Sequence, residues 1–413
     1  MRRFLKLAAG AALGALVATS VWAEETIKIA FIDPLSGPFA TTGTNGKAEW
    51  EFAVEKLVNE QGGVLGGQKL EVVAFDNKIS PKESLIQLQV AIDQGIRFIA
   101  QGNSSGVANA LTDAVNKHNR RNPDKRVLFL NYSAVDPALT NDKCNFWHFR
   151  FDANADIKMD ALTDVIAGSD EIKKIYLIGQ DYSFGKAVAA AAVRFLGEKR
   201  PDIEIVGNEL HPIGKVKDFT PYARKITSSG ANAIITGNWG ADMVGLGKSV
   251  IESGFTGPIF TYYAANNGIT ATFGETGKGS IRLVAEGPLN PPASDRMAAY
   301  VKGFKEKNPD FDITQARITN AVEMLARAIN DAGSTDAVAV AKALEGMEHE
   351  SIWGGTVYMR PDDHQAIQDV HIMAHTNENI TFDSDNSGYG LYVESSVAMA
   401  SADSATTCEM KRP

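Results

Sequence analysis

The sequence predicts an α/β fold with parallel β-sheets, because short apolar runs typical of strands alternate with helical patterns along most of its 413 residues. The first run, residues 26–32 (TIKIAFI), is followed at 46–59 by apolar side chains at helical spacing. Strands that alternate with helices pair in parallel, since each helix covers a face of the sheet. The composition, 44% hydrophobic and 22% charged residues, is typical of a soluble globular protein.

Two series of such elements follow each other along the chain. The first continues with strands at 70–75, 97–100 and 126–130 and helices at 81–94 and 107–118. The second has helices at 155–167, 185–195, 219–228 and 243–253 and strands at 174–178, 203–206, 233–236 and 258–261. A strand at 282–285, helices at 294–307, 314–332 and 335–344, and strands near 355–359, 370–374 and 391–393 complete the pattern. No Ser/Pro-rich linker separates the series, so we expect two lobes that the chain crosses more than once.

Residues 1–23 have the pattern of a secretory signal peptide, with a basic start, an apolar run and Val21-Trp22-Ala23 before the cleavage point. The apolar run is shorter than the roughly 20 residues that a membrane span needs. Cleavage removes three positive charges, so the formal charge changes from −9 to −12 over the remaining 390 residues. The acidic chain has no stripe of Lys and Arg, which excludes nucleic acid as the expected partner.

Cys144 and Cys408 are the two cysteines of the sequence. An exported protein with two cysteines has one possible pairing, which would tie the C-terminal tail to the body of the protein. Two separate thiols are the alternative, because the sequence does not give the distance between the two residues.

Residues 102–106 (GNSSG) match the G-x-S-x-G nucleophile elbow and lie between a predicted strand and a predicted helix. One hypothesis is therefore an exported serine hydrolase with Ser104 as its nucleophile. None of the seven histidines lies in a recognisable signature of a catalytic base. The alternative is that Ser104 or Ser105 is a helix N-cap, where free N–H groups and the positive helix end attract a carboxylate. We favour this second interpretation and predict no catalytic residue.

Two further motifs predict neither a nucleotide nor a metal ion. Residues 62–67 (GGVLGG) follow a helix, whereas a dinucleotide fingerprint follows a strand. A helix C-cap and turn account for these glycines. His371 and His375 lie in a run that alternates like a strand, where four residues span about 13 Å. We expect no cofactor and no metal ion.

Polar and aromatic residues follow the predicted strands of both series. In the first series they are Asp33 to Ser36, Ser104-Ser105 and Asn131-Tyr132-Ser133; in the second they are Asp181 to Phe184, Asn238-Trp239 and Tyr262-Tyr263. Open parallel sheets bind ligands at the carboxyl ends of their strands. If the lobes face each other, these loops line a cleft with hydroxyl and N–H groups on one wall and aromatic rings on the other.

Several motifs resemble the periplasmic substrate-binding proteins of branched-chain amino acid type ABC transporters, the Leu/Ile/Val-binding family. They are residues 27–30 (IKIA) with 35–38 (LSGP), 60–64 (EQGGV), 180–186 (QDYSFGK) and 218–220 (DFT). The resemblance covers nearly the whole mature chain. It implies the type I periplasmic binding protein fold, in which two Rossmann-like lobes with parallel sheets are joined by a hinge of three crossovers. Lobe 1 then comprises 24–149 and 285–352, lobe 2 comprises 150–284 and 353–400, and 401–413 form a C-terminal tail.

The resemblance also implies ligand-binding residues in both lobes. The serine that holds a ligand carboxylate at a helix start falls on Ser104, next to Ser105. The other implied positions are Thr42, Ser133, Val135, Tyr182, Phe184, Trp239, Tyr263 and Ala264.

Ala264 is the main departure from the family pattern, because the family places here a glutamate that pairs with the ligand ammonium. A buried ammonium without a partner costs several kcal/mol, unless Asp181 or Asp136 replaces that glutamate. The sequence therefore favours a carboxylate with an apolar or aromatic body, and an amino-acid binder with a relocated acidic residue is the alternative.

The resemblance implies a monomeric periplasmic receptor, not an enzyme, that binds a small organic solute and delivers it to an inner-membrane ABC permease. A sensor that presents the solute to a chemoreceptor or a kinase would use the same cleft.

Overall fold

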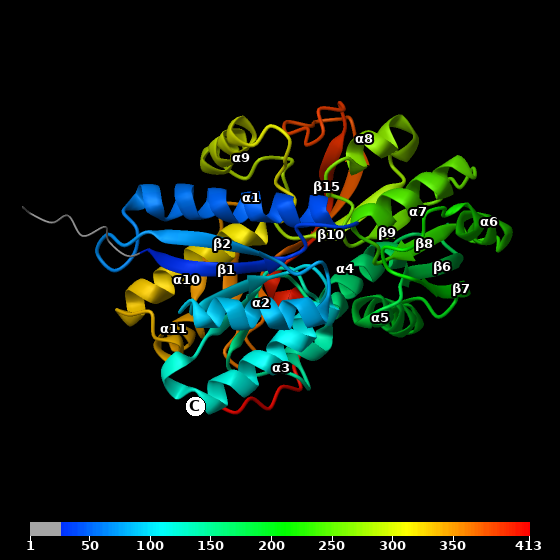
Figure 1. Cartoon of the computed structure of the whole chain (residues 1–413). Helices are drawn as coiled ribbons and strands as arrows, with labels where there is room; N and C mark the ends of the chain where they lie inside the picture. The colour runs from blue at the N-terminus through cyan, green and yellow to red at the C-terminus, as the bar shows by residue number, and fades with distance from the viewer. Residues whose placement is uncertain (1–25) are drawn as a thin grey trace, which may run out of the picture.

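The computed structural model describes residues 26–413, so the predicted signal peptide lies outside the described residues. Figure 1 shows two α/β lobes, each built around its own sheet, which the chain visits in turn. The predicted fold class is confirmed, since parallel pairs dominate both large sheets. Within residues 26–413, no helix has the length and apolarity that a membrane crossing requires.

Lobe 1 contains a five-stranded sheet with the order β2-β1-β3-β4-β5, in which all neighbouring strands are parallel. Residues 29–33 of β1 are buried, because helices cover both faces of the sheet. The predicted strands do not include β5, whose three residues are too few to show a pattern. The strands are β1 (Ile27–Asp33), β2 (Leu70–Asp76), β3 (Phe98–Gln101), β4 (Leu128–Asn131) and β5 (His148–Arg150).

The helices of lobe 1 come from two parts of the chain. Three of them connect the strands: α1 (Ala40–Leu57), α2 (Pro81–Asp93) and α3 (Ser105–Arg121). The others, α9 (Asp295–Lys307), α10 (Arg317–Ala332) and α11 (Ala337–Leu344), follow the elements of lobe 2 and pack on lobe 1. Helix α1 begins before the predicted start at residue 46. Gly43 in its first turn lies so close to Pro34 that a Cβ atom would meet the Pro34 carbonyl oxygen at 1.8 Å.

Lobe 2 contains a seven-stranded sheet with the order β15-β14-β10-β9-β8-β6-β7. The strands from β7 to β10 are parallel, whereas β14 and β15 are antiparallel additions at one edge. The strands are β6 (Lys174–Gln180), β7 (Glu204–His211), β8 (Ala233–Thr236), β9 (Ile259–Thr261), β10 (Ile281–Ala285), β14 (Val370–Thr376) and β15 (Gly390–Val397). The helices are α4 (Ala155–Ala167), α5 (Ser183–Lys199), α6 (Thr220–Ser228), α7 (Gly240–Glu252), α8 (Ile269–Phe273) and α12 (Met399–Ala402).

The chain passes between the lobes after β5, after β10 and after a small antiparallel sheet. This sheet consists of β11 (Glu348–Glu350), β12 (Thr356–Met359) and β13 (Ala366–Ile367). Val357, Met359 and Ala366 lie in the hydrophobic core of lobe 1. The expected start of the last lobe 2 segment at residue 353 is therefore corrected to a position after β13. A single apolar run in the sequence does not reveal which sheet it joins.

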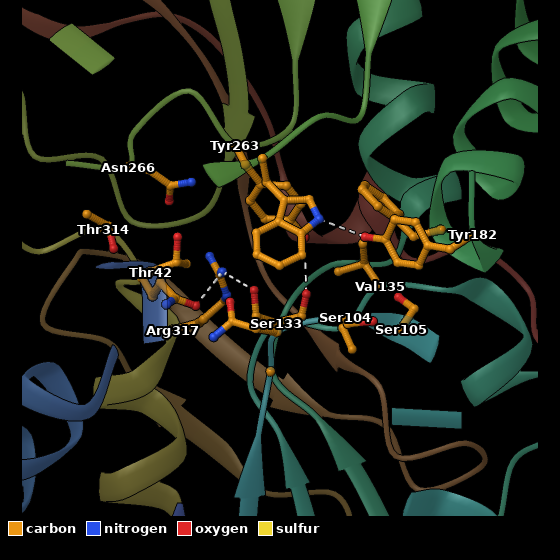
Figure 2. A pocket seen from close by; sticks show the side chains of 16 residues that line it. Thr42, Ser104, Ser105, Ser133, Val135, Tyr182, Tyr263, Asn266, Thr314 and Arg317 are labelled. Carbon is orange, nitrogen blue, oxygen red and sulfur yellow. Dashed lines mark hydrogen bonds between the residues drawn. The ribbon is translucent and has the colours of Figure 1, made fainter. Parts of the chain in front are cut away.

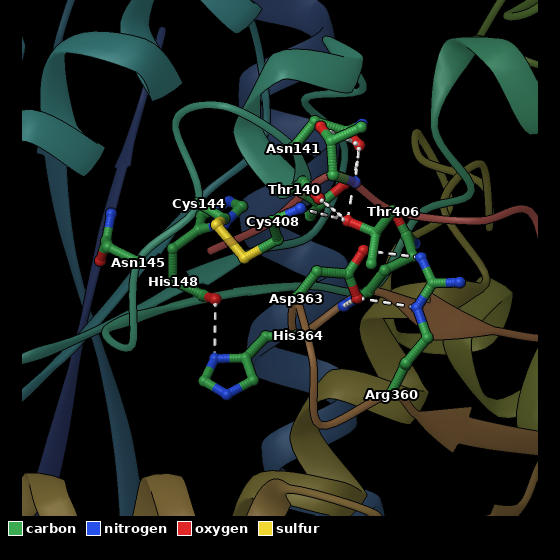
Figure 3. Close-up of a disulfide and its surroundings, with 12 residues drawn as sticks. Thr140, Asn141, Cys144, Asn145, His148, Arg360, Asp363, His364, Thr406 and Cys408 are labelled. Atoms are coloured by element: carbon green, nitrogen blue, oxygen red, sulfur yellow. Dashed lines mark hydrogen bonds and ion pairs between the residues drawn. A yellow bond between two sulfur atoms is a disulfide. The ribbon is translucent and has the colours of Figure 1, made fainter. Parts of the chain in front are cut away.

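The C-terminal tail returns from lobe 2 to lobe 1 (Figure 3). Ala402 of α12 packs in the core of lobe 2, whereas Cys408 forms a disulfide with Cys144 of lobe 1, with 5.8 Å between their Cα atoms. Thr406 donates a hydrogen bond from its hydroxyl to the carbonyl oxygen of Thr140 at 2.7 Å. The tail is therefore a fourth connection between the lobes.

Removal of this disulfide by the paired substitution Cys144→Ser and Cys408→Ser is expected to lower the free energy of unfolding by about 2–4 kcal/mol. The bond joins residues 264 positions apart and so restricts the unfolded chain strongly. Urea unfolding of the wild type with and without dithiothreitol measures the effect. The double variant is the control, since the reductant should leave its stability unchanged. Equal stability of the oxidised and reduced wild type would contradict this prediction.

Candidate functional site

A cavity lies between the two lobes, at the carboxyl ends of strands from both sheets (Figure 2). The volume that the centre of a water-sized sphere can reach inside it is about 30 Å³, which is more than the roughly 10–15 Å³ that a single water molecule needs. Lobe 1 lines it with the start of α1, the loops after β3 and β4, and residues 314–317. Lobe 2 lines it with the loops after β6, β8 and β9. The cavity is at the place where open α/β sheets bind their ligands.

The structure brings nine of the ten predicted ligand-binding residues to this cavity. They are Thr42, Ser104, Ser105, Ser133, Val135, Tyr182, Phe184, Trp239 and Tyr263. Five polar residues that were not predicted to bind the ligand also line it: Asn103, Asn266, Thr314, Gln315 and Arg317. The last three belong to the segment that returns to lobe 1, so no strand end in the sequence marks them.

Ala264 does not line the cavity, which corrects the expectation for this position. Its side chain is buried in a core of lobe 2 that also contains Met243 and Phe273. Asn266, two residues further along the loop after β9, faces the cavity instead. A gapless count along the sequence misses this change, because the loop turns between the two residues.

The two acidic residues expected as substitutes for the family glutamate also lie elsewhere. Asp181 is exposed and pairs with Lys186 on the surface at 3.1 Å. Asp136 is buried, but its carboxylate accepts hydrogen bonds from the Asn109 amide at 2.9 Å and from the backbone N–H of Ala138. Among the described residues, no aspartate or glutamate lines the cavity.

A buried carboxylate, that of Asp33 at the end of β1, holds the loop that carries the cavity serines. It accepts hydrogen bonds from the backbone N–H of Gly102 at 3.1 Å, from that of Asn103 at 2.9 Å and from the Tyr132 hydroxyl. Burial raises the pKa of Asp33 from 3.8 to about 7, although these donors act to lower it. The backbone of the next residue, Ser104, has a φ of +79°. Residues other than glycine rarely adopt this conformation.

Ser104 precedes the first residue of α3, as the N-cap interpretation predicts, but its side chain makes no capping hydrogen bond. Its hydroxyl therefore remains available to a group in the cavity. The Ser105 hydroxyl accepts a hydrogen bond from the backbone N–H of Asp136 at 3.2 Å. Because its oxygen is already an acceptor, its proton is free to donate. These hydroxyls and the positive end of α3 suit an anionic group.

Four aromatic residues of lobe 2 form the opposite wall: Tyr182, Phe184, Trp239 and Tyr263. The indole N–H of Trp239 donates to the Tyr182 hydroxyl at 2.8 Å, which leaves the Tyr182 proton as a donor (Figure 2). Two contacts join this wall to lobe 1. The Tyr263 hydroxyl donates to the carbonyl oxygen of Ser133 at 3.1 Å, and the ring of Phe39 packs on Trp239 with 4.2 Å between ring centroids. The lobes are therefore closed over the cavity.

Arg317 connects the cavity floor to a buried cluster of charges. Its guanidinium donates to the Ser133 hydroxyl at 2.6 Å and lies 3.0 Å from a carboxylate oxygen of Asp152. Lys158 contacts Asp152 at 2.5 Å and Glu286 at 3.5 Å. We call these four residues, Asp152, Lys158, Glu286 and Arg317, the hinge cluster, because Asp152 and Glu286 lie on the first two passages between the lobes.

The hinge cluster contains two acidic and two basic side chains, all almost fully buried. Burial raises the pKa of Asp152 to about 7, and Arg317 opposes this shift. Burial also acts to raise the pKa of Glu286, but Lys158 and Arg317 hold it below its ordinary value. The positive charge of Arg317 is therefore balanced by these carboxylates and contributes little net charge to the cavity.

Residues 26–413 contain neither the ligands of a metal site nor the histidine that a serine hydrolase would need beside Ser104. Within residues 26–413, no group of three or more His, Cys, Asp or Glu side chains is placed to hold a metal ion. No histidine lines the cavity beside Ser104 in the described residues. A nucleophilic serine needs such a base within hydrogen-bond reach.

The two lobes and the cavity between them define a two-lobed solute-binding protein. The chain belongs to the family described as Periplasmic binding protein, whose model matches residues 26–379. Its fold matches that of the type I periplasmic binding proteins. Proteins of this family bind small solutes and interact with the permeases of ABC transporters. The relatives are substrate-binding proteins, and they do not support the serine hydrolase hypothesis.

Among the relatives, Leu/Ile/Val-binding protein homolog 4 of Brucella abortus (strain 2308) is 29% identical over 422 residues, covering 100% of this chain and 99% of that protein. A leucine-, isoleucine-, valine-, threonine-, and alanine-binding protein from Brucella ovis, solved in a closed conformation, has a TM-score of 0.82 and 28% identity. The match covers 94% of this chain and 100% of the Brucella ovis chain.

The fold is also similar to that of a solute binding protein of an ABC transporter from Rhodopseudomonas palustris HaA2, solved in complex with p-hydroxybenzoic acid. The TM-score is 0.76 at 19% identity, over 91% of this chain and 98% of that chain. A likeness at this identity shows the shared fold.

Substitution of one member of the hinge cluster is expected to destabilise the protein strongly. Lys158→Met leaves two buried carboxylates with one cation and should lower the free energy of unfolding by about 3–5 kcal/mol. Lys186→Met is the matched control, because its ion pair with Asp181 is exposed and should be worth less than about 1 kcal/mol. Urea unfolding of both variants checks this, and similar losses would contradict it.

The pKa of Asp33 predicts how stability changes with pH. The unfolded carboxyl loses its proton near pH 3.9, whereas the folded one keeps it up to about pH 7. The stability that this group contributes is therefore complete below pH ~4 and is lost as the pH rises through about 7. The stability of the wild type relative to Asp33→Asn should fall between pH 4.5 and 7.5 and stay constant above pH 8.

Asp76→Asn provides the control for this pH series. Asp76 accepts hydrogen bonds from Ser36 and from the backbone N–H of Leu35. Asp76 is only slightly buried, and this burial acts to raise its pKa. The hydrogen bonds outweigh that effect and hold the pKa below its ordinary value. The stability difference between the wild type and this variant should therefore not change between pH 4.5 and 7.5. A pH-independent difference for Asp33→Asn as well would contradict the assignment.

Proposed function

We propose that this protein is the periplasmic receptor of an ABC importer for a small carboxylate with an apolar or aromatic body. The observation that carries the proposal is the donor character of the cavity. The oxygen atoms of Ser105, Ser133 and Tyr182 already accept hydrogen bonds from the protein, so each hydroxyl still has its proton to donate. Ser104 adds a hydroxyl with no partner among the described residues. A carboxylate, which only accepts hydrogen bonds, matches these donors.

The absence of an acidic residue from the described lining argues against a free amino acid. An ammonium group has three donors and no acceptor, and in this cavity it would meet mainly other donors and the rings of lobe 2. An ammonium left without an anionic partner on binding costs free energy. Benzoate-type ligands are named for structural neighbours of this fold, and a carboxylate on an apolar ring fits the wall formed by Phe184 and Trp239.

A branched-chain amino acid is the second candidate, because relatives along the whole chain are named as Leu/Ile/Val-binding proteins. In that case the ammonium would need backbone carbonyl groups or the Asn266 amide oxygen as acceptors.

We further propose that the chain is exported by its N-terminal segment, acts as a monomer and delivers the bound solute to an inner-membrane permease.

Thermal shift measurements with benzoate, 4-hydroxybenzoate, leucine and 4-methylpentanoate test the ligand class. The acids without an ammonium group should raise the melting temperature, and leucine should raise it less than 4-methylpentanoate does. Ser104→Ala should weaken acid binding by about 1–3 kcal/mol, a factor of about 5 to 150 in Kd, because the carboxylate loses one donor.

Ser80→Ala is the matched control for Ser104→Ala, since Ser80 is the N-cap of another helix of lobe 1, α2, and does not line the cavity. It should lower stability without changing affinity. If leucine alone raises the melting temperature, the amino-acid candidate replaces the proposal. Unchanged affinity in Ser104→Ala would remove that residue from the site.

A further inference from the structure

Two side-chain amides at one end of the cavity contain buried N–H groups without a partner. The Nδ2 atom of Asn266 and the Nε2 atom of Gln315 are both inaccessible to solvent, and neither has a hydrogen-bond acceptor among the described residues. Both residues line the cavity. Buried amide nitrogens are almost always hydrogen-bonded, so these two require an explanation.

The protein fixes the orientation of the Gln315 amide. Its oxygen accepts a hydrogen bond from Arg317 at 3.1 Å, which leaves the nitrogen as the free end. Its backbone N–H donates to the buried carboxylate of Glu49 at 3.0 Å, and the backbone N–H of Thr314 donates to the same carboxylate at 3.1 Å. Gln315 is 3% exposed. The segment is therefore held rigidly, and the unpaired N–H is not a result of a mobile side chain.

Asn266 lies away from Ser104 and Ser105, the serines at the start of α3 that we assign to the carboxylate. The Gln315 amide oxygen is closer to Ser133, because one Arg317 nitrogen donates to both. Figure 2 shows Asn266, Thr314 and Thr42 on one side of the cavity and Ser104, Ser105 and Tyr182 on the other. Asn266 belongs to lobe 2, whereas Thr42, Thr314 and Gln315 belong to lobe 1. A ligand group at this end would thus contact both lobes in the closed state.

We propose that Asn266 and Gln315 form a distal subsite for an uncharged oxygen acceptor at the end of the solute opposite its carboxylate. A hydroxyl, ketone or carboxamide oxygen would have this chemistry. This inference rests on the proposed function, because it takes the serine end as the carboxylate site. The subsite makes the receptor specific for oxygen-substituted acids over the parent acids.

An uncharged acceptor fits this end better than either charged alternative. An ammonium would place its donors against the donors of Asn266 and Gln315. A second carboxylate would bring another negative charge next to Arg317, whose charge Asp152 and Glu286 already balance. Among the described residues, the lining of the cavity contains no other cationic side chain.

Calorimetric titration of the full chain with two matched pairs of acids tests the distal subsite. The pairs are benzoate with 4-hydroxybenzoate and hexanoate with 5-oxohexanoate, in which the second member carries an oxygen far from the carboxylate. In at least one pair the oxygen-bearing acid should bind at least tenfold more tightly. In Asn266→Ala this advantage should fall below threefold, because the affinity for the oxygen-bearing acid should fall more than the affinity for the parent acid.

Asn267→Ala is the matched control, because Asn267 is the next residue of the same loop and does not line the cavity. It should retain the full advantage. Equal binding within both pairs by the wild type would overturn the distal subsite and leave the proposed function standing, and this result does not depend on any variant. An unchanged advantage in Asn266→Ala would also overturn it. If no acid of either pair binds the wild type, the proposed function fails, and the distal subsite fails with it.

Discussion

The ion pairs of the hinge cluster are the interaction on which the two-lobed arrangement depends. Asp152 and Glu286 lie on two of the passages between the lobes, Lys158 lies on the first helix of lobe 2, and Arg317 lies on a helix of lobe 1. Removing four charges from water is expensive, and it is tolerated only where each charge has a close partner. The cluster thus joins both lobes and the passages at one point, and Arg317 extends from there into the cavity.

This position of Arg317 explains why the cavity binds through neutral donors. A free guanidinium would attract any anion, but the charge of Arg317 is already balanced by Asp152 and Glu286. Recognition of an anion then depends on oriented hydroxyl groups and on the N-terminal end of α3. Asp33 fixes this region by accepting hydrogen bonds from the loop before Ser104. Oriented neutral donors favour ligands of the right shape over anions in general.

The sequence predicts the architecture and most of the cavity, because both depend on patterns that local residues carry. Strands that alternate with helices place polar loops at one edge of each sheet, and Ser104, Tyr182 and Trp239 belong to such loops. The strands β5, β11 and β13 escape prediction, since each has only two or three residues, whereas the run at 355–359 correctly predicts β12.

The remaining cavity residues depend on tertiary structure. Gln315 and Arg317 lie where the returning chain enters a helix with an ordinary amphipathic pattern, so nothing local separates them from surface residues. Asn266 is missed because a loop turn shifts the cavity-facing position by two residues from Ala264. The hinge cluster could not be predicted either, because its members, spread over residues 152–317, come together only when both lobes have formed.

Closure of the lobes connects these elements to ligand selection. The aromatic wall and Asn266 belong to lobe 2, whereas the serines, Gln315 and Arg317 belong to lobe 1, so each lobe carries an incomplete site. A solute that accepts hydrogen bonds from donors of both lobes replaces water at those donors. Such a solute binds the closed state more tightly than the open state, and this difference in affinity shifts the protein towards the closed state. A solute that contacts one lobe alone has no such difference and does not stabilise closure. Selection in this receptor is therefore a property of the closed arrangement, which the hinge cluster positions.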